Sequence, residues 1–209
     1  TMAVLNGYGV ALSCIFGAFI LHGDNIRVIL RALPTELMAI LGGSLGARVF
    51  SDVVPPALAL LPATLRARLR LTQQCRPEDL ARVRGAYAAT GIAATLAPFF
   101  ADIAALLRDA HLVIARAGAS TVAELAVVGR PAVLVPLPGA IDDHQSANAA
   151  ALAGATVLPQ ATLTPASLAK TLAALLADPD GLARAAATVA LSGRPDATAR
   201  LADLVETEI

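Results

Sequence analysis

The sequence predicts an α/β domain in which a parallel sheet carries helices on both faces. From residue 37 onward, short apolar runs alternate with stretches of helical spacing, and repeated strand–helix units of this length connect parallel strands. Hydrophobic residues make up 56% of the chain and charged residues 15%, which excludes disorder and favours a well-buried core. Parallel sheets bind ligands beyond the carboxyl ends of their strands, so the loops that follow strands are the candidate functional segments.

The expected elements follow one another in regular order. Strands are expected where short apolar or β-prone runs occur, at 37–41, 69–73, 95–98, 112–115, 132–135 and 156–158. Helices are expected at 47–61, 77–89, from 102, and at 120–128, 144–152, 165–176, 179–191 and 196–206. Pro77 fits a first helical turn, whereas Pro55 and Pro56 predict a kink or break in the first helix.

The first 30 residues do not fit this repeat. We expect 1–30 to be a linker or a remnant of a preceding domain, and 31–209 to be the functional domain. Residues 2–21 contain no charged side chain and are long enough for a membrane span. They also contain Asn6, Ser13 and several glycines and lack the basic flank of a signal peptide. We therefore favour buried strands over a span for this segment.

Charge and ligand spacing exclude several function classes. The formal net charge is zero and no basic run occurs, so nucleic acid is not an expected partner. Neither the cysteines Cys14 and Cys75 nor the histidines His22, His111 and His144 show a metal-ligand spacing. We expect no metal and no cofactor, and the unpaired cysteines fit a reducing cytoplasm.

The first candidate loop, 42–47, reads GGSLGA between a strand and a helix. Glycines allow a sharp turn and close approach to a ligand, and the following helix N-terminus offers free N–H groups to an anion. Many glycine-rich α/β turns bind nothing, so this loop alone leaves phosphate contact and an ordinary turn equally open.

The second candidate loop, 116–124, reads RAGASTVAE, again between a strand and a helix. Gly118 permits a tight turn, and Ser120 is expected to cap the helix. Glu124 lies one residue beyond the position that a capping box requires. Its carboxylate is then available to ribose hydroxyls, as in dinucleotide-binding folds; the alternative is an ordinary solvated surface glutamate.

The third candidate loop, 136–148, reads PLPGAIDDHQSAN and enters a helix with Asp143 as the expected N-cap. His144, Gln145 and Asn148 share one helical face by their spacing. Such polar groups suit sugar hydroxyls, although a hydrogen-bonded surface helix has the same pattern. His144 is a possible general base, but no partner carboxylate can be assigned to it.

Together with Gly129-Arg130-Pro131, these loops resemble the C-terminal domain of family 28 glycosyltransferases from about residue 40 to 205. The resemblance implies a Rossmann-like fold, the donor-binding half of a GT-B glycosyltransferase. It is greatest to the family's peptidoglycan-synthesis branch, which transfers N-acetylglucosamine from UDP to muramyl pentapeptide on undecaprenyl diphosphate and so converts lipid I to lipid II. That activity implies a cytoplasmic enzyme, peripheral on the inner face of the bacterial plasma membrane.

The resemblance also implies roles for single residues. Ser44 and the turn at Gly43 would face the diphosphate and sugar, and Arg27 would contact the nucleotide. Backbone groups of Phe100 would meet the uracil edge, and Glu124 would bind the ribose. The remaining roles fall to two helix starts: Ala119, Ser120 and Thr121 near the phosphates, and Gln145 with His144 and Asn148 at the sugar hydroxyls.

The chain departs from the family pattern at several places. Leu45 stands where the glycine-rich turn usually has Gln, Asp24-Asn25 replace the usual Asn-Pro, and Gly139 stands where a larger residue is expected. No glycine-rich loop with a histidine, the mark of the acceptor-binding half, precedes Gly42. We therefore expect this chain to supply only the leaving-group side, to be inactive alone, and to reach lipid acceptor and membrane through the other domain; we assign no catalytic base.

Two other functions remain open from sequence. The chain could be a stand-alone nucleotide-sugar-binding subunit that works beside a separate acceptor-binding partner. An NAD-binding dehydrogenase domain would need a Gly-x-Gly-x-x-Gly turn, and 42–47 lacks that spacing.

Overall fold

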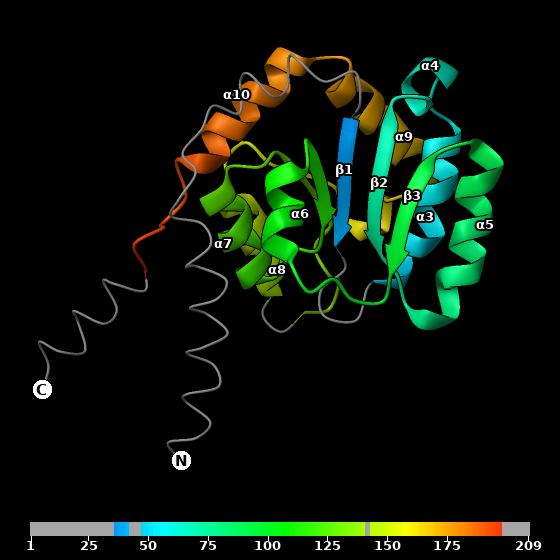
Figure 1. The fold of residues 1–209 in the computed structure, drawn as a ribbon. Coiled ribbons are helices and arrows are strands. Elements are labelled where there is room, and N and C mark those ends of the chain that lie inside the picture. Colours follow the sequence, from blue (N-terminus) through cyan, green and yellow to red (C-terminus); the bar gives the residue numbers. More distant parts are fainter. Residues whose placement is uncertain (1–35, 42–46, 141–142, 198–209) are drawn as a thin grey trace, which may run out of the picture.

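The computed structural model describes residues 36–41, 47–140 and 143–197. Within these residues, parallel strands form one sheet in the order β3-β2-β1-β4-β5-β6 (Figure 1). The strands are β1 (Glu36–Leu41), β2 (Leu69–Gln74), β3 (Ala93–Ala97), β4 (Leu112–Ala115), β5 (Ala132–Leu134) and β6 (Thr156–Val157). The predicted Rossmann-like α/β class is confirmed.

Helices connect each strand to the next, and η3, α9 and α10 follow the last strand. They are α3 (Arg48–Ala59), α4 (Ala63–Arg66), η1 (Pro77–Asp79), α5 (Leu80–Thr90), α6 (Ile103–Asp109), α7 (Ala119–Val128), α8 (His144–Ala151), η3 (Gln160–Thr162), α9 (Pro165–Leu176) and α10 (Pro179–Ala190). Most bounds lie within two residues of those expected from sequence.

Residues 38–41 of β1 and all residues of β4 and β5 are buried. Successive side chains of a strand point to opposite sides, so the central sheet is covered on both faces. Met38 and Ile40 of β1 join one core cluster with residues of α3, α5 and α9. Ala39 and Leu41 join the other, with residues of α6, α7, α8 and α10. Figure 1 shows α3 and α5 on one side of the strands and α6 and α7 on the other. The apolar runs therefore reflect strands covered twice.

The strand order reverses between β1 and β4. The chain builds β2 and β3 outward from β1 on one side, and β5 and β6 outward from β4 on the other. The last residue of β1, Leu41, is in register with the last residue of β4, Ala115. Connections from the two strands leave in opposite directions at this point, which is where open α/β sheets form their ligand crevice.

The break expected at Pro55 and Pro56 is wrong: α3 runs unbroken from Arg48 to Ala59. Pro55 has no N–H for the Ser51 carbonyl, but Arg82 Nη1 donates to that oxygen at 3.3 Å. Pro56 and Asp52 are both exposed. A side chain distant in sequence thus replaces the missing helical bond.

Several sequence-based expectations lie outside the described residues. These are the segment 1–30 with its apolar stretch 2–21, the domain boundary near residue 31, and most of the helix expected at 196–206. Among the described helices, none has the length and apolarity needed to cross a bilayer.

A double-mutant cycle tests whether the Arg82 side chain replaces the helical hydrogen bond that Pro55 cannot make. Arg82→Met is expected to cost about 1 kcal/mol more in the natural chain than in a Pro55→Ala background, because an alanine there supplies its own N–H to the Ser51 carbonyl. Urea unfolding of the natural chain, both single variants and the double variant gives the coupling energy. Arg82 also pairs with Asp52 and Asp79, so the stability lost in the single variant does not isolate the bond to the Ser51 carbonyl. The coupling energy does isolate it, and a coupling energy near zero would contradict the replacement.

Candidate functional site

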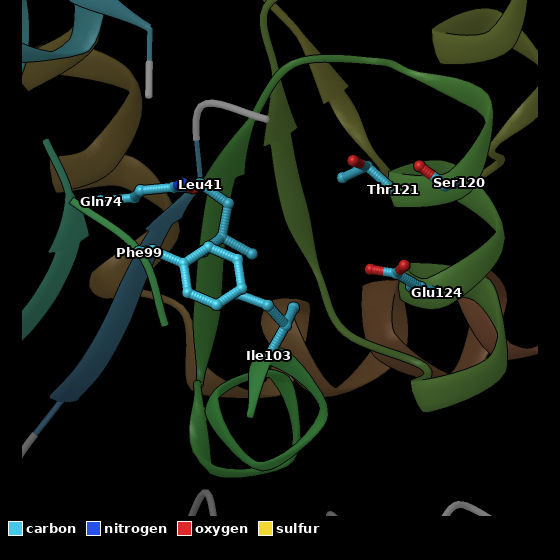
Figure 2. Close-up of a pocket in the computed structure, with 7 residues that line it drawn as sticks. All are labelled: Leu41, Gln74, Phe99, Ile103, Ser120, Thr121 and Glu124. Atoms are coloured by element: carbon cyan, nitrogen blue, oxygen red, sulfur yellow. The ribbon is translucent and has the colours of Figure 1, made fainter. Parts of the chain in front are cut away.

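A pocket opens at the carboxyl edge of the sheet, at the point where the strand order reverses. Two of its lining residues end strands, Leu41 on β1 and Gln74 on β2. Phe99 follows β3 and Ile103 begins α6, and the remaining wall is the first turns of α7 with Ser120, Thr121 and Glu124 (Figure 2). The pocket is therefore assembled by the connections that follow four neighbouring strands.

The N-terminus of α7 presents open backbone donors to this pocket. Gly118 is the N-cap with extended backbone, φ −63° and ψ 148°, and no side chain caps the helix. The first helical bond runs from Val122 N to Gly118 O at 3.0 Å, so the preceding amides of the first turn have no helical partner. Such a terminus attracts anions through its N–H groups and its dipole.

The expectation that Ser120 caps this helix is wrong. The helix begins at Ala119, one residue before Ser120, because Gly118 already has the extended conformation of an N-cap. Ser120 is exposed on the first turn instead, and its hydroxyl lines the pocket. The start of α7 is thus more open to a ligand than the sequence suggested.

Glu124 lies one turn further along α7, on the same face as Thr121. In Figure 2 both side chains point from the helix toward the side of the pocket that holds Leu41 and Phe99. Partial burial raises the pKa of the Glu124 carboxyl above its ordinary value. Within the described part of the chain, no hydrogen bond or ion pair occupies this carboxylate. Among the described residues it is therefore a partly desolvated acceptor without a bonding partner.

The opposite wall is apolar and includes residues that the sequence analysis did not select. Phe99, a residue that is 66% exposed, lines the pocket, whereas Phe100, the residue selected from sequence, is half-buried and does not line it. Gln74 is buried and its Nε2 donates to Pro98 O at 3.1 Å, which fixes the backbone just before Phe99. Position after a strand is the signal that could have identified these residues.

The polar residues of α8 do not line this pocket, and two of them hold loops. Gln145 Oε1 accepts from Leu137 N at 3.0 Å, in the loop after β5. Asn148 Nδ2 donates to Ala117 O at 3.1 Å, in the turn before α7. His144 is exposed at the start of the helix. Asp143 is the N-cap as expected, but its carboxylate accepts from the Ser146 hydroxyl at 2.7 Å and not from a backbone N–H.

The structure therefore gathers only part of the predicted site. Ser120, Thr121 and Glu124 lie together, with Ala119 exposed at the helix start. Arg27, Gly43 and Ser44 lie outside the described residues. Among the residues that are described, no three His, Cys, Asp or Glu side chains group closely enough to hold a metal ion.

Solved structures similar to this chain include several glycosyltransferases. MurG of Acinetobacter baumannii superposes with a TM-score of 0.75 at 35% identity, over 83% of this chain and 52% of that one. WaaG, a glycosyltransferase of lipopolysaccharide biosynthesis, superposes with a TM-score of 0.62. The match covers 81% of this chain and 46% of the WaaG chain. At 20% identity, WaaG supports the fold alone.

Two curated relatives carry the name UDP-N-acetylglucosamine–N-acetylmuramyl-(pentapeptide) pyrophosphoryl-undecaprenol N-acetylglucosamine transferase. The one from Granulibacter bethesdensis is 65% identical over 82% of this chain, and the one from Rhodospirillum rubrum is 60% identical over 80%. The matches cover 46% and 44% of these relatives, so the chain spans about half their length. The sequence profile of the glycosyltransferase family 28 C-terminal domain matches residues 37–201. The chain thus belongs to glycosyltransferase family 28 and carries the C-terminal domain of that family.

Proposed function

We propose that this chain is the donor-binding half of an inverting glycosyltransferase and that it binds UDP-N-acetylglucosamine. The observation that carries the proposal is the α7 wall of the pocket: a helix N-terminus without a side-chain cap and, one turn away, a partly buried carboxylate that pairs with none of the described residues. The first suits a diphosphate, and the second suits the two hydroxyls of a ribose. The relatives' names, which specify a UDP-linked sugar, agree with this pairing.

The two walls of the pocket suggest how the nucleotide lies. Amides of Ala119, Ser120 and Thr121 would hold the diphosphate, and Glu124 would accept from the ribose. The exposed Phe99 ring faces the same space (Figure 2) and offers a flat apolar surface on which a base can stack. Backbone groups of the neighbouring Phe100 would then meet the uracil edge.

The sugar would lie toward α8 and the first glycine-rich turn. Ser44 and Gly43 follow β1 in sequence, and His144, Gln145 and Asn148 begin α8. Because Gln145 Oε1 already accepts from Leu137 N, its NH₂ group is the part left to donate to a sugar hydroxyl or acetamido oxygen. Arg27 would contact the nucleotide from the chain before β1.

The chemistry proposed for this half is stabilisation of the leaving group. Displacement at the anomeric carbon places negative charge on the departing UDP, and preorganised amides at a helix N-terminus stabilise such charge. The attacking hydroxyl must approach in line from the other side, where a separate acceptor-binding half would present it. We assign no catalytic base to this chain and expect no turnover from it alone.

The biological setting follows from the same proposal. The acceptor would be the undecaprenyl-diphosphate-linked muramyl pentapeptide that the relatives' names describe, so the complete enzyme would convert lipid I to lipid II at the cytoplasmic face of the membrane. Residues 31–209 would form the donor-binding domain, and 1–30 would belong to the connection with the acceptor half.

Calorimetric titration tests the proposal directly. The chain is expected to bind UDP and UDP-N-acetylglucosamine and not NAD, and Glu124→Ala is expected to weaken UDP binding by about 100-fold, since two hydrogen bonds to a charged acceptor are lost. Glu78→Ala, at an exposed glutamate in η1, is the matched control and should leave UDP affinity unchanged. Binding of NAD without UDP would overturn the assignment.

The two adjacent phenylalanines separate base stacking from general apolar packing. Phe99→Ala is expected to weaken UDP binding about tenfold, the usual order for one base–aromatic stack, whereas Phe99→Tyr should retain the affinity. Phe100→Ala keeps the backbone groups assigned to uracil and should change UDP affinity little. Equal losses at both positions would indicate that neither ring stacks on the base.

The raised pKa of Glu124 predicts a trade between stability and binding. Burial disfavours the ionised carboxyl, so ionisation lowers the stability of the folded state. This cost is fully present above the folded-state pKa and absent below the ordinary pKa of about 4.3. Glu124→Gln is expected to raise the Tm at pH 8 by no more than about 2 °C, while weakening UDP binding. Thermal melts from pH 8 to pH 4 should show the gain shrinking as the pH falls; a gain that is constant with pH would contradict the assignment of the penalty to this carboxyl.

A further inference from the structure

Arg116 makes an unusual set of contacts across the carboxyl edge of the sheet. Its Nη1 donates to Val135 O and to Pro136 O, each at 3.1 Å. Its Nη2 donates to Gln160 Oε1 at 2.6 Å. The guanidinium carbon lies 5.5 Å from the centroid of the Phe50 ring on α3. One side chain that follows β4 thus contacts the connections after β5 and β6 and the first turn of α3.

These contacts engage both terminal nitrogens of the guanidinium within the fold. Val135 and Pro136 are buried beyond the end of β5, and buried carbonyls need a donor. Arg116 is half-buried and does not line the pocket beside Glu124. The planar guanidinium donates to two carbonyls and an amide oxygen and lies over a ring, so its position is fixed. This is a structural role, which differs from direct contact with a phosphate.

A continuous chain of contacts leads from Arg116 to α8. Arg116 holds Pro136 O, and the next residue, Leu137, donates its N–H to Gln145 Oε1 on the first turn of α8. The nucleotide wall on α7 is reached differently, through Asn148 Nδ2 and Ala117 O. Loss of the Arg116 fork would therefore loosen the loop before α8 and leave the face of Ser120, Thr121 and Glu124 in place.

We propose that Arg116 is a positioning residue for the sugar side of the donor site: it fixes the loop after β5, and through that loop Gln145, without touching the nucleotide. This inference rests on the proposed function, because it takes α8 as the sugar-facing side. It predicts that binding of the sugar moiety and binding of UDP separate when Arg116 is changed.

The test is titration of UDP and of UDP-N-acetylglucosamine into the natural chain and three variants. Arg116→Lys keeps the charge and loses the fork; the ratio of the Kd for UDP-N-acetylglucosamine to the Kd for UDP should rise about tenfold, the order expected for one charge-assisted bond. Gln160→Ala removes only the Nη2 acceptor and should raise the ratio by a smaller factor.

Arg130→Lys is the matched control. Arg130 is a buried arginine that also donates to two backbone carbonyls, those of Leu107 and Arg108 at the end of α6, away from the pocket residue Ile103 at its start. Burial lowers the pKa of both arginines. Arg130→Lys should lower the Tm as Arg116→Lys does and leave the Kd ratio unchanged.

The outcomes distinguish this inference from the proposed function. If Arg116→Lys weakens the affinity for UDP and for UDP-N-acetylglucosamine by the same factor, in proportion to the fall in Tm, Arg116 is only a structural residue. A large loss of UDP affinity itself would indicate direct contact with the nucleotide. Either result overturns the positioning role while UDP binding by the natural chain still stands. Failure of the natural chain to bind UDP overturns the proposed function, and the inference with it.

Discussion

Backbone polar groups at the carboxyl edge of a parallel sheet must find partners beyond the ladder, and this constraint organises the site. The carbonyls after β3, β4 and β5 are met by side-chain donors: Gln74 at Pro98, Asn148 at Ala117, and Arg116 at Val135 and Pro136. The first amides of α7 are treated differently, since no side chain caps them. An edge with its acceptors satisfied and a set of donors left open is suited to an anionic ligand.

The same edge explains why the fold could be predicted more fully than the site. Alternation of apolar runs with helical spacing located the strands, because the central strands β4 and β5 are fully buried and the strand–helix unit repeats along the chain. The unbroken helix through Pro55 could not be predicted, since the donor that makes it possible is Arg82, far along the chain. Local propensity describes what a segment prefers alone, and here a tertiary contact decided the outcome.

Sequence spacing groups side chains that belong to one helix, and it cannot group side chains that come from several connections. Thr121 and Glu124 share a face of α7 by spacing alone, and the structure places both in the pocket. Phe99 and Gln74 come from separate connections that only the sheet order brings together. Gln145 and Asn148 were read as polar groups facing a ligand, yet part of each amide bonds a loop. Spacing shows which residues share a face and not what that face meets.

Preorganisation of α7 follows from how both of its ends are held. At the N-terminal end, Asn148 anchors the turn at Ala117. At the other end, Gly129 has φ +66°, and a Cβ there would lie 3.0 Å from Ala190 Cβ on α10, so the two helices meet more closely than another residue would allow. A helix fixed at both ends cannot reorient when charge develops on a bound diphosphate. In the function proposed above, its amides would therefore stabilise that charge without a reorganisation cost at the moment of reaction, which is the condition under which such dipoles are effective.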